Sequence, residues 1–198
     1  MKSIQFPVSL KFHISSISND FTATDAMGNT LAYVRQKMFK FKEEIQVFND
    51  KSRSKVNYTI NADKWLDFNT AYAFKDENGN NLGKVARKGW KSLWKASYQI
   101  IDQHNNLQFT ISEANPWSKI ADSLLGEIPV LGLLTGYMFH PKYKVEDVNF
   151  RTVAILKKIP SMFGRRFEIT KEGSFDEDDS ERIILSLMMM VLLERRRG

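Results

Sequence analysis

The sequence contains no cysteine. This absence excludes a disulfide framework, thiolate metal sites and a cysteine nucleophile, and it fits a reducing cytoplasm. Glycine and proline are also few, at 10 and 5 among 198 residues, whereas there are 14 Phe, 6 Tyr and 4 Trp. Disordered chains have few aromatic residues, so we expect a globular protein. Its length suits one well-buried core, which predicts a single domain over residues 1–198.

Long hydrophobic runs are missing as well. The longest apolar stretches, near 128–139 and 183–193, fall short of the ~20 residues that span a bilayer. Residues 1–10 lack the apolar core and the cleavage site of a secretory signal. We therefore expect a cytoplasmic protein with no transmembrane span.

What the sequence does contain is a period-two alternation of apolar residues over its first two-thirds. The clearest case is Val8, Leu10, Phe12 and Ile14, whose side chains share one face of an extended strand. The same alternation recurs at Leu31 and Tyr33; Ile45 and Val47; Val56, Tyr58 and Ile60; Trp94, Ala96, Tyr98 and Ile100; and Leu107, Phe109 and Ile111. Later strands are expected near 143–148, 152–158 and 166–170.

A loose repeat links several of these strands. In each copy a strand ends in an aspartate, a polar turn of four to five residues follows, and the next strand opens on leucine. The three aspartates are Asp25, Asp76 and Asp102. Turns rich in Asp, Asn and Gly join antiparallel strands into hairpins. The count of about twelve short strands predicts an all-β scaffold.

Residues 115–142 interrupt the alternation and are expected to form an insertion. Asn115 and Pro116 are typical of a helix start, and Gly126 of its end. The following stretch, 126–139, is apolar but broken by proline and glycine, which excludes one regular element. Two interpretations stay open: this stretch covers one mouth of the scaffold, which we favour, or it docks on a membrane or partner.

The end of the chain predicts a helix from about Ser180 to Arg195. Acidic residues precede it and arginines end it, and each sign complements the partial charge of that helix terminus. Ser180 is the expected N-cap. Between the charges only Ser186 is polar, so no face of the helix suits water. The helix must be surrounded by protein.

The number and length of the expected strands indicate what surrounds this helix. A helix with its side chains is ~10 Å across, and an eight-stranded barrel is filled by its own side chains, so a barrel that houses a helix needs more strands. Twelve strands of ~6 residues with connections of ~4 need about 120 residues, which this chain supplies. We therefore predict a mainly β (α+β) fold, a closed antiparallel barrel around the hydrophobic C-terminal helix. Such a barrel has no lumen for a ligand.

At this level of detail the chain resembles a known family. The aspartate turns, the segment 82–95, the stretch 126–143 and the ending 185–198 together resemble the LURP-one-related family, and its bacterial members in particular. That family belongs to the tubby C-terminal-like superfamily, which also includes the phospholipid scramblases. The resemblance implies a twelve-stranded barrel around a hydrophobic C-terminal helix.

The densest basic and aromatic segment is the candidate site for an anionic ligand. Its residues are Lys84, Arg87, Lys88, Trp90, Lys91 and Lys95. Lysine and arginine bind phosphates through charge-assisted hydrogen bonds, and tryptophan suits a lipid–water boundary. The same residues fit a solvated strand edge with protective lysines and Trp94 in the core, which the sequence alone favours. Nucleic acid is a weaker alternative, because the other basic residues are scattered along the chain.

Metal and catalytic sites are not indicated. The acidic run 176–179 is contiguous, unlike a calcium loop, and carboxylates are favoured at a helix start in any case. His13, His104 and His140 have no ligand spacing. No nucleophile elbow, phosphate-binding loop or metalloprotease helix occurs. We therefore expect a protein that is not an enzyme and needs no metal or cofactor.

Two functional hypotheses follow. In the first, the protein is a non-enzymatic module that binds anionic phospholipid or phosphoinositide headgroups, as tubby-like domains do, at the cytoplasmic face of the inner membrane. In the second, it is a soluble scaffold barrel with a protein partner. Scramblase activity is not expected, because the final helix is too short to span a membrane.

Overall fold

The computed structural model describes residues 4–13, 20–35, 45–63, 71–87, 97–114, 142–161 and 165–195. These form twelve strands and one helix: β1 Val8–Phe12, β2 Phe21–Thr24, β3 Thr30–Val34, β4 Ile45–Phe48, β5 Val56–Asp63, β6 Ala71–Asp76, β7 Asn81–Arg87, β8 Ser97–Ile101, β9 Leu107–Glu113, β10 Lys142–Asp147, β11 Thr152–Ile159, β12 Arg166–Lys171 and α3 Glu177–Arg195. The insertion predicted at 115–142 lies outside the described residues except for Lys142, which opens β10.

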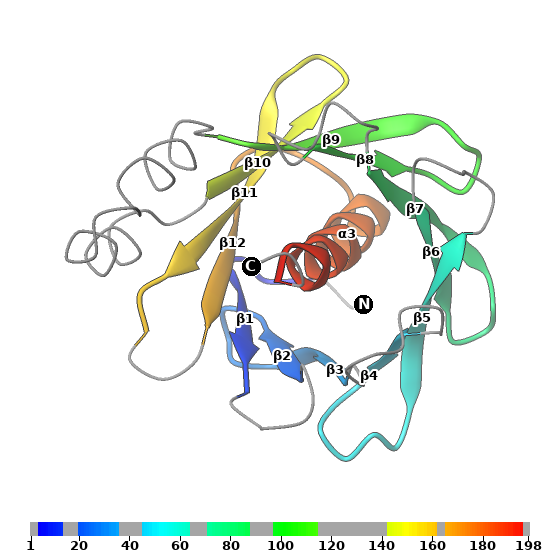
Figure 1. The fold of residues 1–198 in the computed structure, drawn as a ribbon, viewed down its shortest axis with the longest axis vertical. Helices are drawn as coiled ribbons and strands as arrows, with labels where there is room; N and C mark the ends of the chain where they lie inside the picture. Colours follow the sequence, from blue (N-terminus) through cyan, green and yellow to red (C-terminus); the bar gives the residue numbers. More distant parts are fainter. Residues whose placement is uncertain are drawn as a thin grey trace, which may run out of the picture.

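The strands close into one barrel. Each strand pairs antiparallel with its neighbours in the chain, and β1 pairs with β12 to complete the ring. Figure 1 shows this ring with α3 running through its middle. The predicted closed barrel of about twelve strands around a central C-terminal helix is therefore confirmed. Among the described residues, no helix is both long and apolar enough to cross a membrane.

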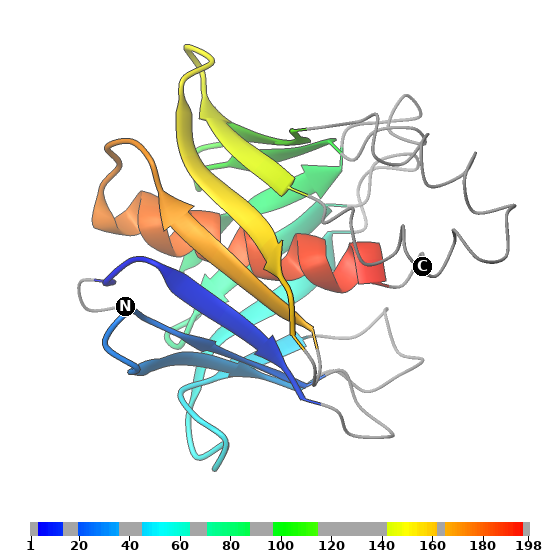
Figure 2. The same ribbon diagram turned by 90° about the vertical axis from the view of Figure 1, so that its left-hand side faces the viewer.

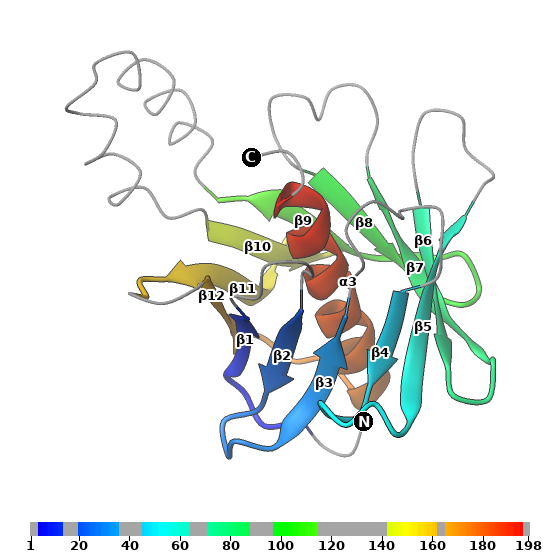
Figure 3. The same cartoon turned by 60° about the horizontal axis from the view of Figure 1, so that its bottom comes forward.

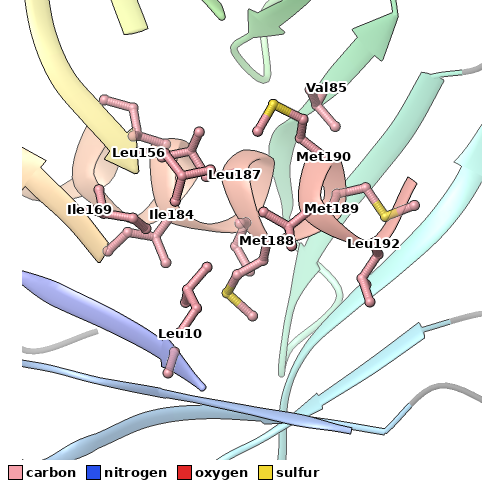
Figure 4. Close-up of a cluster of buried hydrophobic side chains, with 14 of the residues drawn as sticks. Leu10, Val85, Leu156, Ile169, Ile184, Leu187, Met188, Met189, Met190 and Leu192 are labelled. Atoms are coloured by element: carbon pink, nitrogen blue, oxygen red, sulfur yellow. The ribbon is translucent and has the colours of Figure 1, made fainter. Parts of the chain in front are cut away.

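The helix forms the centre of the hydrophobic core. From Ile183 to Leu192 every apolar side chain is at most 4% exposed. Figure 4 shows Met188, Met189 and Met190 leaving the helix in different directions toward the surrounding strands. The unbranched, polarisable methionine side chain fills irregular space between a round helix and a pleated wall. The all-round apolar pattern thus has the role that the sequence predicted.

The start of the helix differs from the prediction. The helix begins at Glu177, and its N-cap is Asp176 rather than Ser180, because Asp176 Oδ1 accepts the backbone N–H of Asp179 at 2.7 Å. This is the usual bond from a cap to the third helical residue. Ser180 lies within the first turn, where its hydroxyl donates to the Asp176 carbonyl at 2.7 Å. A contiguous acidic run offers several cap residues, and the local pattern does not distinguish among them.

One strand presents the opposite face from the one its sequence pattern suggests. In β3 the residues that face the core are Ala32 and Val34, both 0% exposed, and not Leu31 and Tyr33. The register sets this face, because Ala32 pairs with the buried Ala23 of β2. Tyr33 is buried on the outer side of the wall. Small side chains such as Ala32 leave room in the core for the central helix. The alternation of the larger residues Leu31 and Tyr33 in the sequence did not indicate that these small residues face the core.

The hairpin turns repeat one hydrogen-bonding scheme. Asp76 Oδ1 accepts the N–H groups of Asn78 and Asn80, and its Oδ2 accepts from the Asn80 amide. The turns at Asp25 and Asp102, whose positions the sequence also predicted, repeat this scheme, and a fourth at Asp147 does so with Arg151 in place of asparagine. Sequence inspection missed the fourth turn because its loop contains Val148 and Phe150.

The turns define one end of the barrel, which we call the turn end. The hairpins β2–β3, β4–β5, β6–β7, β8–β9 and β10–β11 reverse direction there, and α3 begins there. Figure 2 shows these turns and the start of α3 on its left, and Figure 3 shows α3 rising from that end to the opposite one.

Candidate anion-binding surface

The structure describes two of the six residues predicted to bind an anion. Lys84 and Arg87 lie on β7, whereas Lys88, Trp90, Lys91 and Lys95 lie outside the described residues. Lys84 is on the outer face of the wall. Arg87 shares the face of the buried Val85, and its guanidinium lies 6.0 Å from the ring centroid of Tyr98. A ligand on one face of β7 therefore contacts only one of these two residues.

A second group of cations gathers on the outer face of four adjacent strands. We call it the basic wall, and Figure 1 shows its strands β10, β11, β12 and β1 side by side. Alternate residues of each strand point into the core, so the residues between them point outward. The cations are Lys142, Lys144, Lys157, Arg166 and Lys11.

Cations face each other directly within the basic wall. Lys11 of β1 is the register partner of Arg166 of β12, and Lys142 of β10 is the register partner of Lys157 of β11. Side chains directly opposite each other on one face lie ~5 Å apart at Cβ, and like charges in such pairs destabilise a sheet. The wall thus concentrates positive charge where sheet stability alone disfavours it.

Few carboxylates balance this charge. Glu146 pairs with Lys144 at 2.7 Å and Glu168 pairs with Lys157 at 2.8 Å. Lys11, Lys142 and Arg166 form no ion pair among the described residues. All three are exposed.

A polar cluster adjoins the wall on the outer side of β1, β2 and β3. His13 Nε2 is hydrogen bonded to Thr22 Oγ1 at 2.7 Å, and the Tyr33 hydroxyl donates to Asp20 Oδ2 at 2.6 Å. The other carboxylate oxygen of Asp20 is buried and has no hydrogen-bond partner within the described part of the chain. Thr22 is the register partner of both Lys11 and Tyr33, so the cluster and the wall are continuous.

The pKa values in this cluster reveal further cations beside it. Burial lowers the pKa of His13, and the charges of Lys51 and Lys11 lower it further, against the opposing effect of Asp20. Burial and the bond to Asp20 raise the pKa of Tyr33, while Arg35 and Arg53 oppose that rise. The charges of Arg35, Lys51 and Arg53 therefore act on this cluster together with that of Lys11.

Sequence inspection missed the basic wall because its residues come from four separate strands, each with one or two of these cations. The only signal was the overall charge of +6, which exceeds what the segment 84–95 explains. Within the described residues there is also no group of three or more metal-ligating side chains. Exposed lysines and arginines on one wall can bind phosphates by charge-assisted hydrogen bonds.

Comparisons with known proteins agree with the fold. A family model described as LURP-one-related matches residues 30–122. The X-ray structure of a protein from Arabidopsis thaliana is similar to this one with a TM-score of 0.50 and 13% sequence identity, over 98% of this chain and 94% of that chain. No curated protein sequence matches the chain significantly.

The likeness to the plant protein concerns the fold, since the identity is low. The particular resemblance to bacterial members stays a prediction. The family model matches β3 to β9 and the segments between them. The resemblance to the LURP-one-related family seen in the sequence is therefore confirmed by a family model that matches residues 30–122.

Proposed function

We propose that this protein is a non-enzymatic module that binds anionic phospholipid headgroups through the basic wall. The observation that carries the proposal is the like charge of two cross-strand register pairs, Lys11 with Arg166 and Lys142 with Lys157. An anionic surface laid against these strands relieves both repulsions. A binding role without catalysis suits a barrel whose interior is filled by its own helix.

The wall and the predicted segment are alternative sites. In the ring of twelve strands, β7 stands opposite β1, six strands away in either direction. A flat membrane that lies along the outer face of β1 and β12 therefore does not reach the outer face of β7. Separate variants of the two regions distinguish them.

The test measures binding to vesicles of phosphatidylcholine, with and without phosphatidylserine, by co-sedimentation. The wall variant is Lys11→Gln with Arg166→Gln. Its control is Lys75→Gln, which removes a cation on β6, far around the ring from β1 and β12. A third variant, Lys88→Gln with Lys91→Gln, tests the predicted segment.

We expect binding only to anionic vesicles, weakened by salt. A basic residue near an anionic membrane contributes about 1 kcal/mol, so the wall variant should bind roughly 30-fold more weakly. The control variant should bind like the unmodified protein. Loss of binding in the Lys88/Lys91 variant alone would assign the site to the predicted segment instead of the wall. Equal binding to both kinds of vesicle, or none, would overturn the lipid proposal.

The second hypothesis, a scaffold barrel with a protein partner, has support of a different kind. Large apolar side chains are exposed at the turn end. Protein partners bury such side chains.

A further inference from the structure

A histidine stands beside the fixed cations of the basic wall. His13 follows directly after β1, and because alternate residues of a strand share one face, its half-buried side chain lies on the outer face with that of Lys11. Its backbone N–H donates to the Asp20 carbonyl at 2.9 Å, so the pairing of β1 with β2 extends to His13. Imidazole is the side chain whose charge ordinarily changes near neutral pH. The charge of this part of the surface therefore depends on pH.

The His13 ring contacts uncharged groups that tolerate a proton on it. Its Nε2 is hydrogen bonded to Thr22 Oγ1 at 2.7 Å, and its centroid lies 6.3 Å from that of the Tyr33 ring. A protonated imidazole donates from both nitrogens, and a hydroxyl oxygen can accept. The bond to Thr22 therefore persists when the ring is protonated, with the hydroxyl as the acceptor. Proton uptake adds a positive charge without breaking this contact.

The charges around the ring come from several elements. On the β12 side, Arg166 is the register partner of Lys11. The carboxylate of Asp20 is engaged on one side, because its Oδ2 accepts the Tyr33 hydroxyl at 2.6 Å. Among the described residues, the charged groups that act on the His13 ring or on the adjoining Tyr33 are Lys11, Lys51, Arg35, Arg53 and Asp20. Cations outnumber the carboxylate in this list, so the surroundings disfavour a further positive charge.

An anionic membrane reverses this balance. In the free protein, burial and the charges of Lys51 and Lys11 hold the pKa of His13 below its usual 6.5, against the opposing effect of Asp20. The ring is therefore uncharged at neutral pH. Negative headgroups laid against the wall favour its protonated form. Because such coupling is reciprocal, protonation of His13 in turn favours the binding of headgroups, which therefore becomes stronger as the pH falls below about 6.5.

We propose that His13 is a proton switch for the basic wall: uptake of one proton by its ring strengthens the binding of anionic phospholipid headgroups. The inference rests on the proposed function and adds a form of regulation to it. Lys11 and Arg166 supply a constant positive charge, and His13 adds a charge that depends on pH. The protein thus binds an anionic membrane more tightly in mildly acidic surroundings than at neutral pH.

The test measures co-sedimentation with vesicles of phosphatidylcholine and phosphatidylglycerol from about pH 5.5 to about pH 8 at constant ionic strength. The phosphodiester of phosphatidylglycerol keeps its charge over this range, so any change with pH belongs to the protein. The variants are His13→Gln, which stays neutral, and His13→Arg, which stays charged. The control is His104→Gln, which removes an exposed histidine from the β8–β9 turn, on strands away from β1 in the ring.

We expect the unmodified protein to bind about five-fold more tightly at the acidic end of the range than at the alkaline end, since one positive charge near an anionic membrane has roughly that effect. His13→Gln should bind at every pH as the unmodified protein does at the alkaline end. His13→Arg should bind at every pH as it does at the acidic end. His104→Gln should keep the full dependence on pH, and thermal unfolding checks that each variant is folded.

Two results would overturn this inference and leave the proposed function standing. The first is binding to anionic vesicles that does not change with pH. The second is a dependence on pH that His13→Gln retains, which would assign the proton to another group. Absence of binding to these vesicles at every pH would instead overturn the proposed function, and the inference with it.

Discussion

The Nε atom of Arg182 lies 3.1 Å from the position that a Cβ atom would take on Gly83. Arg182 is 6% exposed, and its Nε donates to the Leu82 carbonyl at 2.8 Å. Its other nitrogens bond Gln103 at 3.1 Å and Asp179 at 2.5 Å. The missing side chain at Gly83 thus makes room for a buried guanidinium that connects α3 to β7 and to the β8–β9 turn. This contact orients an otherwise featureless apolar helix inside the barrel.

Gly83→Ala should destabilise the fold strongly. A Cβ at this position would lie 2.3 Å from the Ile101 carbonyl oxygen, and the φ of +113° disfavours any side chain. We expect a loss of at least about 2 kcal/mol in the free energy of unfolding, measured by urea denaturation. The control is Gly79→Ala, whose φ is +84° but whose Cβ would meet nothing within 4 Å, so it should lose about 1 kcal/mol. Equal losses would contradict the role of close packing at Gly83.

Asp102→Asn should lower the stability of the protein and make that stability less dependent on pH. Burial opposes ionisation of Asp102, but hydrogen bonds from Asn106, Gln108 and His104 outweigh it and lower the pKa from 3.8 to about 2. A carboxylate with a lowered pKa contributes stability above its unfolded pKa, and this is lost as pH falls through the folded value.

We therefore expect the unmodified protein to lose stability between about pH 4 and pH 2 through this group. Asp102→Asn should lose about 1–3 kcal/mol at pH 7, because its amide cannot accept all these bonds. The difference between the two proteins should shrink as pH falls in this range, as measured by urea denaturation at each pH. A constant difference would contradict this assignment.

Ser186→Ala should leave the fold as stable as before or more stable. The Ser186 hydroxyl is fully buried in the core and has no hydrogen-bond partner among the described residues. Its removal relieves an unsatisfied polar group and adds helix propensity, so we expect a gain of about 0.5–2 kcal/mol. The contrasting variant is Ser180→Ala, which removes the bond to the Asp176 carbonyl and should lower stability. Thermal unfolding compares the two variants, and destabilisation by Ser186→Ala would indicate a bond that the structure does not show.

Lys11→Glu should stabilise the barrel while it weakens binding to anionic vesicles. The change converts the repulsion between Lys11 and Arg166 into an attractive cross-strand pair. A gain of about 0.3–1 kcal/mol is expected at low salt and less at high salt, because exposed pairs are screened. Lys75→Glu is the control, since Lys75 faces the register partners Thr59 and Asn81, which carry no charge. Unfolding temperatures at low and high sodium chloride check the prediction, and an unchanged value would show that the wall cations do not repel each other measurably.

Local patterns predicted most of the strands and three of the turns correctly. The local patterns were correct where one residue suits one structural position, as with Asp76 in a turn or Leu10 facing the core. They were wrong where two residues close in the sequence suit the same position. Asp176 and Ser180 both suit a helix cap, and Ala32 and Tyr33 both suit burial, so only the register and the contacts decided between them.

The sequence by itself determined that a helix with no face for water must lie inside a closed β wall, because burial of apolar surface is the largest favourable term and depends mainly on the residues of the helix. Only the tertiary structure decided which outward residues meet. Lys11 and Arg166 are 155 positions apart in the chain, yet they are direct partners across β1 and β12. Side chains on the outer face contribute little to folding. The local sequence pattern therefore does not indicate which residues of the adjacent strands lie beside them. Their grouping follows from barrel closure and register alone.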